Sequence, residues 1–338
     1  MREKPERCAP RRLAEWLNPT GERKVHSLID KVYQQKNLQM AWEKVKANRG
    51  AGGVDGESIE AFDGRSQERL SQLHAELKAD HYQPLPVRQK RIPKVGRPNE
   101  HRMLGIPAIY DRVCQQALVN RLESIFEPVF DAASFGYRRG LSTKDALRKV
   151  WKEIEAGGEW IVDADLRDFF GSADQSKLLT LISQRISDGR VLKLIESMLK
   201  AGAWGEGRLF PTERGVPQGG VISPLASNIL LTPFDREMRR RGYQLTRYAD
   251  DWCITCTSAA EARAALTAAW LARIHRRLPL VAARRVAFPL SRNRVALARY
   301  RAAARVLAVS QSVRHELLKA GIAPSSINVV PDGVELPP

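Results

Sequence analysis

The sequence predicts an α+β fold in which amphipathic helices come first and a few short strands follow. In the first 80 residues, apolar side chains recur at the spacing of one helix face, as Leu70, Leu73 and Leu77 do. Further along, the short apolar runs WIVDA and WCITC lie next to acidic residues and turn signals, which favours strands. Separate groups of helices and strands, rather than a regular alternation, are typical of α+β proteins.

The elements expected in the first half are mainly helical. They are helices over most of residues 1–80, a strand at 87–94, a helix at 111–127 and a helix at 142–154. The early helices are interrupted by NRGAGGVDG at 48–56, which contains too much glycine for a helix. Ser142 and Asp145 have the spacing of a capping box, so we expect a helix to begin there.

The second half is expected to contain most of the strands. The expected elements are a strand at 160–164, helices at 175–187 and 189–200, a loop at 211–220, a helix at 222–240 and strands at 244–248 and 252–256. The last two strands are separated only by Ala249, Asp250 and Asp251, which predicts a hairpin with acids at its tip. Cys253 and Cys256 have the spacing of a metal or redox motif. On a strand, however, they face opposite sides, so we expect core packing.

Composition excludes several classes of protein. The chain has 338 residues, 43% of them hydrophobic and 28% charged, which are globular values and exclude a disordered or collagen-like chain. No apolar run is long enough for a membrane helix, so we expect no membrane partner. The charged N-terminus does not resemble a signal peptide, and four cysteines fit a reducing compartment. We therefore expect a cytoplasmic protein.

The positive charge is unevenly distributed. The net charge is +17, which points to a polyanion such as nucleic acid or anionic lipid. Residues 262–338 carry 13 basic and 3 acidic groups, a net +10, and the rest of the chain carries +7. A composition shift this sharp predicts a boundary near residues 260–270.

Three acidic residues at strand ends point to metal chemistry. Asp165 ends the strand at 160–164, and Asp250 with Asp251 occupies the hairpin tip. Carboxylates that meet at strand ends repel one another unless a cation lies between them. Oxygen ligands favour Mg²⁺, and two ions about 3.5–4 Å apart are the arrangement for in-line phosphoryl transfer. The alternative is that these are solvated carboxylates in turns.

The motifs, taken in order, resemble a known family. YADD at 248–251 resembles the YxDD box of reverse transcriptases, and PQGG at 217–220 resembles their nucleotide-side loop. Upstream, the resemblance includes NRGAGGVDG, RIPK, HRMLGIPAIYDRVCQQAL and SFGYRRGLSTKDAL. The set is similar to the reverse transcriptase/maturase proteins of bacterial group II introns over about residues 20–262. It implies right-hand polymerase fingers and palm at 21–262, after an N-terminal extension at 1–20.

The resemblance also implies roles for single residues. The two Mg²⁺ ions would be held by Asp165, Asp250, Asp251 and the backbone carbonyl of Leu166. The residues implied to contact the incoming nucleotide are Lys94, Arg102, Phe170 as a steric gate, Gln218 and Gly219. Those implied to contact nucleic acid are Arg91, Arg138 and Arg139. Gln175 departs from the pattern, because many relatives have a His there, and we expect a mild effect.

The C-terminal segment resembles a different family. Residues 263–338 are similar to part of a GT-B-fold glycosyltransferase, which implies a partial Rossmann-like α/β fragment without an independent function. A strand at 305–309, a helix at 310–320 and a strand at 328–333 are expected. The motifs of the polymerase thumb that complete relatives contain are not found in this sequence. We interpret the junction near 265–272 as an insertion or deletion event, or as an assembly error.

The function expected from the resemblance is RNA-directed DNA polymerisation. The expected partners are an RNA template, in particular group II intron RNA, a DNA primer and deoxynucleotides. Two alternatives remain open at this point. One is an RNA-binding, maturase-like protein that does not polymerise, and the other is an inactive chimeric remnant.

Overall fold

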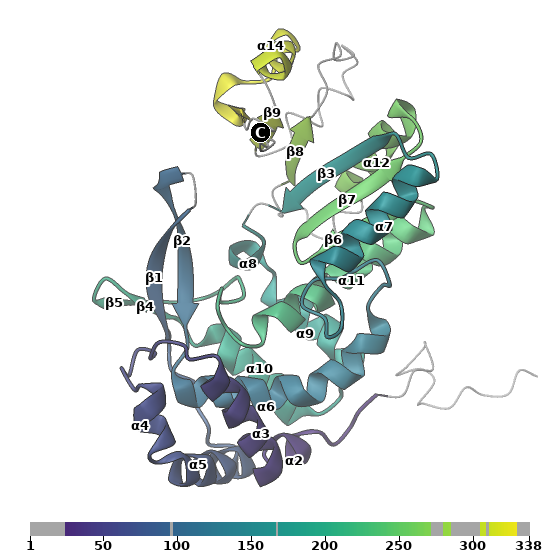
Figure 1. The fold of residues 1–338 in the computed structure, drawn as a ribbon. Helices are drawn as coiled ribbons and strands as arrows, with labels where there is room; N and C mark the ends of the chain where they lie inside the picture. Colours follow the sequence, from purple (N-terminus) through teal and green to yellow (C-terminus); the bar gives the residue numbers. More distant parts are fainter. Residues whose placement is uncertain are drawn as a thin grey trace, which may run out of the picture.

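The protein is built from a helical base and two β-sheets that rise from it (Figure 1). The structure, a computed structural model, describes residues 24–94, 97–166, 168–271, 280–284, 305–308 and 311–329. One sheet has four strands in the order β2-β1-β4-β5, and the other has six strands in the order β10-β9-β8-β3-β7-β6. We refer to the first as the fingers sheet and to the second as the palm sheet.

The helical base forms around one large hydrophobic core. Its helices are α2 (Ile29–Val32), α3 (Gln35–Ala47), α4 (Ile59–Asp63), α5 (Ser66–Ala79), α6 (Ile109–Phe126), η1 (Glu127–Val129), α8 (Phe169–Ser172), α9 (Gln175–Ser183) and α10 (Gly189–Lys200). Trp42 and Phe62, whose ring centroids lie 4.5 Å apart, join α3 to α4. None of the helices in the described ranges is long and apolar enough to span a membrane.

The glycine-rich segment at 48–56 packs against the start of α6. A Cβ atom on Gly53 would lie 2.4 Å from the Cα atom of Ala108, which is closer than real atoms approach. Because the obstacle is backbone, a neighbouring side chain cannot move aside to make room. The sequence indicated only that the glycines interrupt a helix. The structure shows that Gly53 is also required for the close contact with Ala108.

The fingers sheet is a long ribbon with a small hairpin at its side. Its strands are β1 (Val87–Lys94), β2 (Arg97–Ile106), β4 (Ala203–Gly205) and β5 (Arg208–Phe210). β1 and β2 are antiparallel, and β1 also pairs in parallel with β4. The strand predicted at 87–94 is confirmed, whereas β2, β4 and β5 were not predicted. Much of the β1–β2 ribbon is exposed, so its sequence lacks the apolar alternation that marks a half-buried strand.

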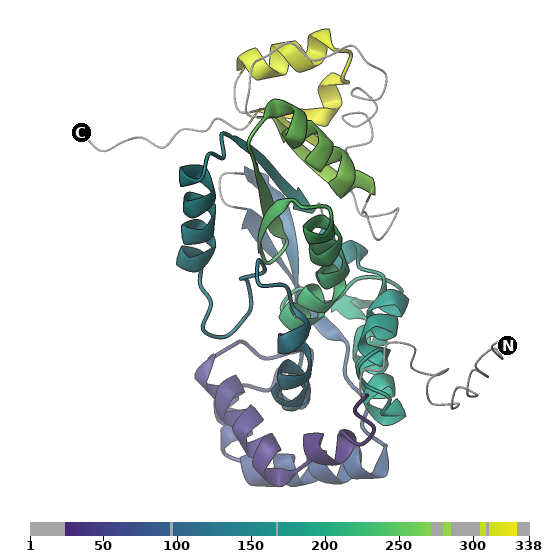
Figure 2. The same cartoon turned by 90° about the vertical axis from the view of Figure 1, so that its right-hand side faces the viewer.

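The palm sheet has helices on both faces, with a single helix on one of them (Figure 2). Its central strands are β3 (Trp160–Leu166), β7 (Asp251–Cys256) and β6 (Gln244–Tyr248), all antiparallel. Trp252, Ile254 and Leu245 pack in a second core with α11 (Ser223–Arg240) and α12 (Ala259–Leu271). α7 (Thr143–Glu155) lies over the opposite face and begins with the predicted capping box.

The described part of the C-terminal segment extends the palm sheet. β8 (Leu280–Arg284) pairs antiparallel with β3, and β9 (Arg305–Ala308) and β10 (Ile327–Val329) follow in parallel. α14 (Gln311–Lys319) and η2 (Pro324–Ser326) lie between β9 and β10. The predicted order of strand, helix and strand is confirmed in these residues, and residues 309–310 and 330–333 lie outside the described ranges. The segment shares its hydrogen-bonded sheet with the palm.

Gly53→Ala should destabilise the fold by about 1–3 kcal/mol or more, because the added methyl group meets the backbone of Ala108. Urea unfolding followed by circular dichroism measures this difference. Gly189→Ala is the matched control, since a Cβ atom there meets nothing within 4 Å and alanine favours the helix that begins at this residue. Equal stability of the two variants would contradict the close packing.

Candidate active site

The paired aspartates lie at the tip of the β6–β7 hairpin, as the sequence predicted. Tyr248 pairs with Asp251 across the hairpin, so Ala249 and Asp250 alone make the turn. Ala249 is buried and adopts a left-handed conformation with a φ of 59°. Asp250 is half-buried, and Asp251 is exposed at the first position of β7. The turn therefore presents two carboxylates in succession.

Asp165 reaches the same end of the palm sheet from β3. The last pair between β3 and β7 at this end joins Ala164 to Trp252. The next residue of β3 is Asp165 and the neighbouring residue of β7 is Asp251, so their backbones lie side by side. The side chain of Asp165 lies outside the described residues. Leu166 is half-buried and packs against both hydrophobic cores.

This set of donors suits a hard divalent cation. Carboxylate oxygens are the ligands that Mg²⁺ prefers, and the chain places three aspartates at adjacent strand ends. Among the described side chains, which do not include that of Asp165, no group of three His, Cys, Asp or Glu residues could hold a metal ion. Asp250 and Asp251, together with the backbone position of Asp165, are the residues that would hold Mg²⁺.

A buried arginine supports the hairpin tip from behind. The side chain of Arg247 is 0% exposed, and it forms two hydrogen bonds with the carboxylate of Asp235 in α11, at 2.8 and 2.7 Å. Its Nη1 atom also donates to Oδ1 of Asn228, at 3.0 Å, and to the carbonyl oxygen of Ala249, at 2.6 Å. Because this last contact is made with the turn itself, the arginine fixes the turn that carries both aspartates.

The loop at residues 133–138 is bound to the same tip. Two backbone hydrogen bonds, of 2.8 and 2.9 Å, join it to Arg247. Nδ2 of Asn228 donates to the carbonyl oxygen of Gly136, at 2.9 Å. A Cβ atom on Gly136 would lie 2.2 Å from the backbone nitrogen of Ala249, so only glycine allows this approach. The FGYRRG motif is therefore packed directly against the YADD turn.

Of the three arginines predicted to contact nucleic acid, Arg138 has an internal role. Its guanidinium donates to the carbonyl oxygens of Asp131 and Ser134, at 2.7 and 2.6 Å, and to Glu127, at 2.9 and 2.6 Å. Only 10% of its side chain is exposed. Arg91 and Arg139 are exposed, and each forms a surface ion pair with a glutamate. Of these three side chains, Arg91 and Arg139 are therefore the two that lie at the surface.

The PQGG loop is attached to the fingers sheet. The backbone nitrogen of Gly105 in β2 donates to the carbonyl oxygen of Gln218, at 2.7 Å. Gly219 has a φ of 103°, and a Cβ atom there would lie 2.8 Å from the carbonyl oxygen of Gly105. Gln218 is half-buried and Gly219 is exposed. The two residues predicted to line the nucleotide pocket thus lie against β2, in the loop that leads into α11.

Phe170 is positioned by the same loop. It lies in α8, is half-buried and makes an edge-on contact with Phe169, with ring centroids 5.3 Å apart. Its carbonyl oxygen accepts a hydrogen bond of 2.7 Å from Val216. This places the predicted steric gate beside the PQGG loop, a few residues after Asp165 in the chain.

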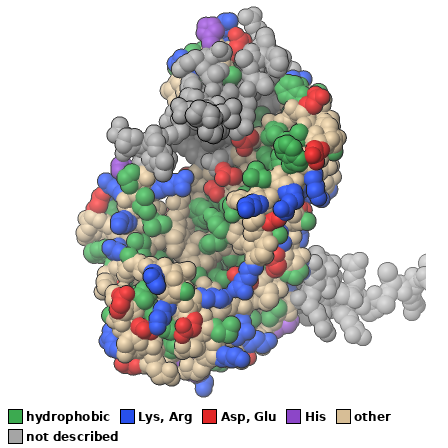
Figure 3. Space-filling view, in the orientation of Figure 1, with side chains coloured by type: hydrophobic (Ala, Val, Ile, Leu, Met, Phe, Trp, Pro, Cys, Tyr) green, Lys and Arg blue, Asp and Glu red, His purple; other side chains and the backbone are tan. Residues whose placement is uncertain are grey.

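Charged side chains of the fingers sheet and of the palm sheet shift the pKa of Tyr137 in opposite directions. Burial, and after it the charge of Asp250, raises the pKa of Tyr137, whereas the charge of Arg102 in β2 lowers it. Arg102 is exposed and pairs with Ile92 of β1, while the side chain of Lys94 lies outside the described residues. In Figure 3, basic side chains of the fingers and acidic side chains of the palm face each other across a hollow.

Residues 92–278 match the sequence profile of the family described as "Reverse transcriptase (RNA-dependent DNA polymerase)". The chain belongs to the reverse transcriptase family. The match continues past residue 262 to residue 278 and gives no support to a glycosyltransferase fragment in residues 263–338.

Two curated relatives illustrate the extent of the similarity. The chain is 35% identical to protein YkfC of Escherichia coli (strain K12), over 72% of this chain and 65% of that protein. It is 36% identical to the group II intron-encoded protein LtrA of Lactococcus lactis subsp. cremoris, over 58% of this chain and 32% of that protein. A solved structure titled "Partial Cas6-RT-Cas1--Cas2 complex" matches 73% of this chain, with a TM-score of 0.46 and 23% identity. This reverse transcriptase chain thus spans less than two thirds of either curated relative.

Gln175 supports the reverse transcriptase site although sequence reasoning expected little of it. It is buried, and its Nε2 atom donates to the carbonyl oxygens of Leu199, Thr212 and Gly215, at 3.2, 3.2 and 3.0 Å. These bonds fix the chain just before the PQGG loop. The roles of Arg247, Asp235 and Gln175 were all missed, because their partners lie far away in the sequence.

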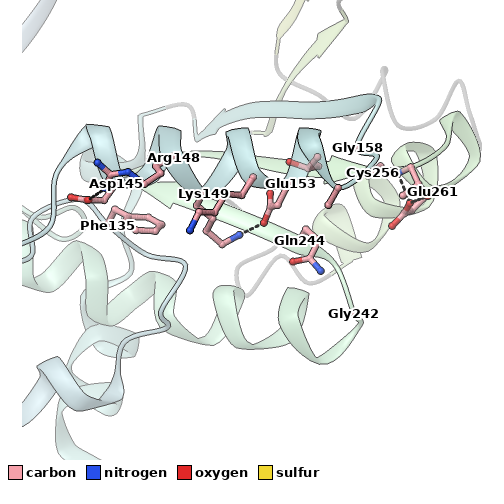
Figure 4. Close-up of a pocket in the computed structure, with 14 residues that line it drawn as sticks. Phe135, Asp145, Arg148, Lys149, Glu153, Gly158, Gly242, Gln244, Cys256 and Glu261 are labelled. Atoms are coloured by element: carbon pink, nitrogen blue, oxygen red, sulfur yellow. Dashed lines mark hydrogen bonds and ion pairs between the residues drawn. The ribbon is translucent and has the colours of Figure 1, made fainter.

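A separate recess lies between α7 and the β6–β7 hairpin, towards the end of the hairpin away from its tip (Figure 4). Its volume is about 610 Å³, and its lining includes Lys149, Glu153, Thr255 and Cys256. Lys149 bridges the recess by donating to Glu153 and, at 3.2 Å, to Thr246. None of the predicted site residues lines it, so we treat it as distinct from the active site.

Arg247→Met should destabilise the protein by about 3–5 kcal/mol, because it leaves the buried carboxylate of Asp235 without a partner. Chemical unfolding measures the loss. The double variant Arg247→Met/Asp235→Leu should recover much of it, since no buried charge remains. Arg240→Met, which removes an exposed ion pair with Glu237, is the control and should cost less than about 1 kcal/mol. A similar small loss for Arg247→Met would contradict the proposed role of the pair.

Proposed function

We propose that this chain is an RNA-directed DNA polymerase of the group II intron type, acting in the cytoplasm. The proposal is carried by one observation. A chain of the reverse transcriptase family brings Asp165, Asp250 and Asp251 to adjacent strand ends, next to a basic fingers ribbon. Similarity to a group II intron-encoded protein makes group II intron RNA the proposed template, with a DNA primer and deoxynucleotides as the other substrates.

The residues divide the work of nucleotidyl transfer. The primer 3′-hydroxyl oxygen attacks the α-phosphorus of the deoxynucleotide, the bond to pyrophosphate breaks and the hydroxyl proton is released. When bound to the aspartates, two Mg²⁺ ions supply the charge stabilisation that this displacement needs. Arg102 and Lys94 contact the triphosphate, a charge-assisted role that suits both residue types. Phe170 excludes the ribose 2′-hydroxyl, while Gln218 and Gly219 line the pocket.

A second candidate function is RNA binding without polymerisation. It is favoured by the exposed guanidinium groups of Arg91, Arg102 and Arg139, which can bind phosphates whether or not Mg²⁺ chemistry follows. Filter binding to structured RNA, beside an extension assay, separates the two candidates. Affinity without extension supports the binding protein, and absence of both supports an inactive remnant.

The glycosyltransferase-like origin of residues 263–338 is a separate proposal. It is supported only by the resemblance of the sequence and by the β9-α14-β10 order. Sequencing of genomic DNA and transcript across residues 265–272 tests it. A continuous, well-covered read excludes an assembly error, and an interrupted one removes the segment from the protein.

Asp250→Ala should reduce Mg²⁺-dependent extension of oligo(dT) on poly(rA) by more than about 100-fold, because it removes a ligand of the catalytic ions. Incorporation of labelled dTTP gives the measurement. Asp30→Ala changes an exposed aspartate of α2 in the helical base and should extend normally. Extension that survives Asp250→Ala would mean that the catalytic site is misassigned.

Affinity for RNA should fall roughly 20- to 40-fold between 50 and 200 mM salt if roughly three phosphates are contacted. Fluorescence anisotropy with a labelled RNA measures this dependence. Arg139→Ala should reduce the slope of log affinity against log salt concentration by about 1, the value for one phosphate contact. Arg240→Ala, at the end of α11, should leave this slope unchanged. A salt-independent affinity would count against any nucleic-acid function.

A further inference from the structure

Tyr137 is an exposed aromatic residue in an unusual backbone conformation beside the active site. Its φ is 61°, in the left-handed region that large side chains rarely adopt. Its side chain is 51% exposed, so burial of the ring gives little stability in return. Glycine or asparagine would fit this backbone better. An outlier of this kind persists when its surroundings enforce it, and such outliers concentrate at functional sites.

The residues on both sides of Tyr137 enforce this conformation. Gly136 is held against the turn at Ala249 and accepts a hydrogen bond from Asn228. Arg138 is anchored by its four hydrogen bonds within the loop and to Glu127. The loop therefore presents the Tyr137 side chain next to the tip that carries the two aspartates.

The charges around Tyr137 define a polar space between fingers and palm. Burial raises the pKa of the phenol, and Asp250, Tyr248 and Asp251 raise it further, while Arg102 lowers it. A phenol is neutral at pH 7, and its hydroxyl can donate a hydrogen bond. Across this space lie a basic residue of the fingers and two acids that suit Mg²⁺. An anionic group held between them would meet the phenol hydroxyl.

We propose that Tyr137 contacts the incoming deoxynucleotide, with its hydroxyl donating a hydrogen bond to the triphosphate between Arg102 and the aspartates. This inference rests on the proposed polymerase function and adds a substrate contact to it. A neutral phenol binds a phosphate oxygen without adding charge, and its rigid ring places the donor at a fixed height above the loop. This role accounts for an aromatic residue at a backbone position that favours glycine.

The test compares three variants in steady-state extension over a range of dTTP concentrations. Tyr137→Phe should raise the KM for dTTP roughly tenfold with little change in kcat, since it removes one hydrogen bond to a charged group. Tyr137→Asn should raise KM at least as much while its Tm stays equal to or above that of the wild type, because asparagine tolerates the left-handed backbone. Trp151→Ala, an exposed aromatic of α7, is the control and should leave KM unchanged.

The outcomes separate this inference from the proposed function. An unchanged KM in Tyr137→Phe, with extension still abolished in Asp250→Ala, overturns the inference and leaves polymerisation standing. A loss of Tm in Tyr137→Asn that accounts for its loss of activity also overturns the inference, because the role would then be structural.

If the wild-type protein does not extend primers, the inference can be tested by a binding measurement that needs no turnover. The chain is mixed with an RNA template, a dideoxy-terminated primer, Mg²⁺ and dTTP, and tyrosines are nitrated with tetranitromethane. Mass spectrometry should show that dTTP protects Tyr137, while Tyr33 in the helical base reacts equally with and without nucleotide. Equal nitration of Tyr137 in both conditions overturns the inference.

Discussion

The bidentate pair between Arg247 and Asp235 is the interaction on which the arrangement of the active site depends. It joins α11 to β6 in the interior, where neither charge could remain without the other. The same guanidinium bonds the turn at Ala249, and the backbone of Arg247 bonds the loop at 133–138. One buried side chain thereby fixes the hairpin tip, the motif packed against it and the helix behind it.

A second set of contacts connects the palm to the fingers. Gly105 of β2 bonds Gln218, and Gly219 allows the two backbones to meet. Gln175 fixes the chain just ahead of this loop through three carbonyl oxygens. These contacts are made by backbone atoms at glycines and by one buried amide. The residues predicted to line the nucleotide pocket thus lie where the fingers sheet meets the loop that leads into α11.

Local patterns predicted the elements well where burial is one-sided. Ser142 and Asp145 form the predicted capping box, and the β6–β7 hairpin lies where the spacing of its acids indicated. The prediction failed for β2, whose exposed residues carry no apolar alternation, and for β4 and β5, which are only three residues long. Arg138 was expected to reach nucleic acid, but its chemistry is equally suited to carbonyl oxygens of its own loop. A sequence shows that a residue is charged, but it does not show whether that residue is exposed or bonded within the protein.

The sequence by itself determined the family and the order of the motifs, and it predicted which three aspartates would hold metal, because these are encoded in short contiguous stretches. Tertiary structure alone decided that β3 and β7 pair in a register that places Asp165 beside Asp251. It also decided that Arg247 meets Asp235 and that the loop carrying Tyr137 packs against the turn at Ala249. Contacts of this kind join residues that are distant in the chain, and neither periodicity nor composition records which distant residue fills a buried position.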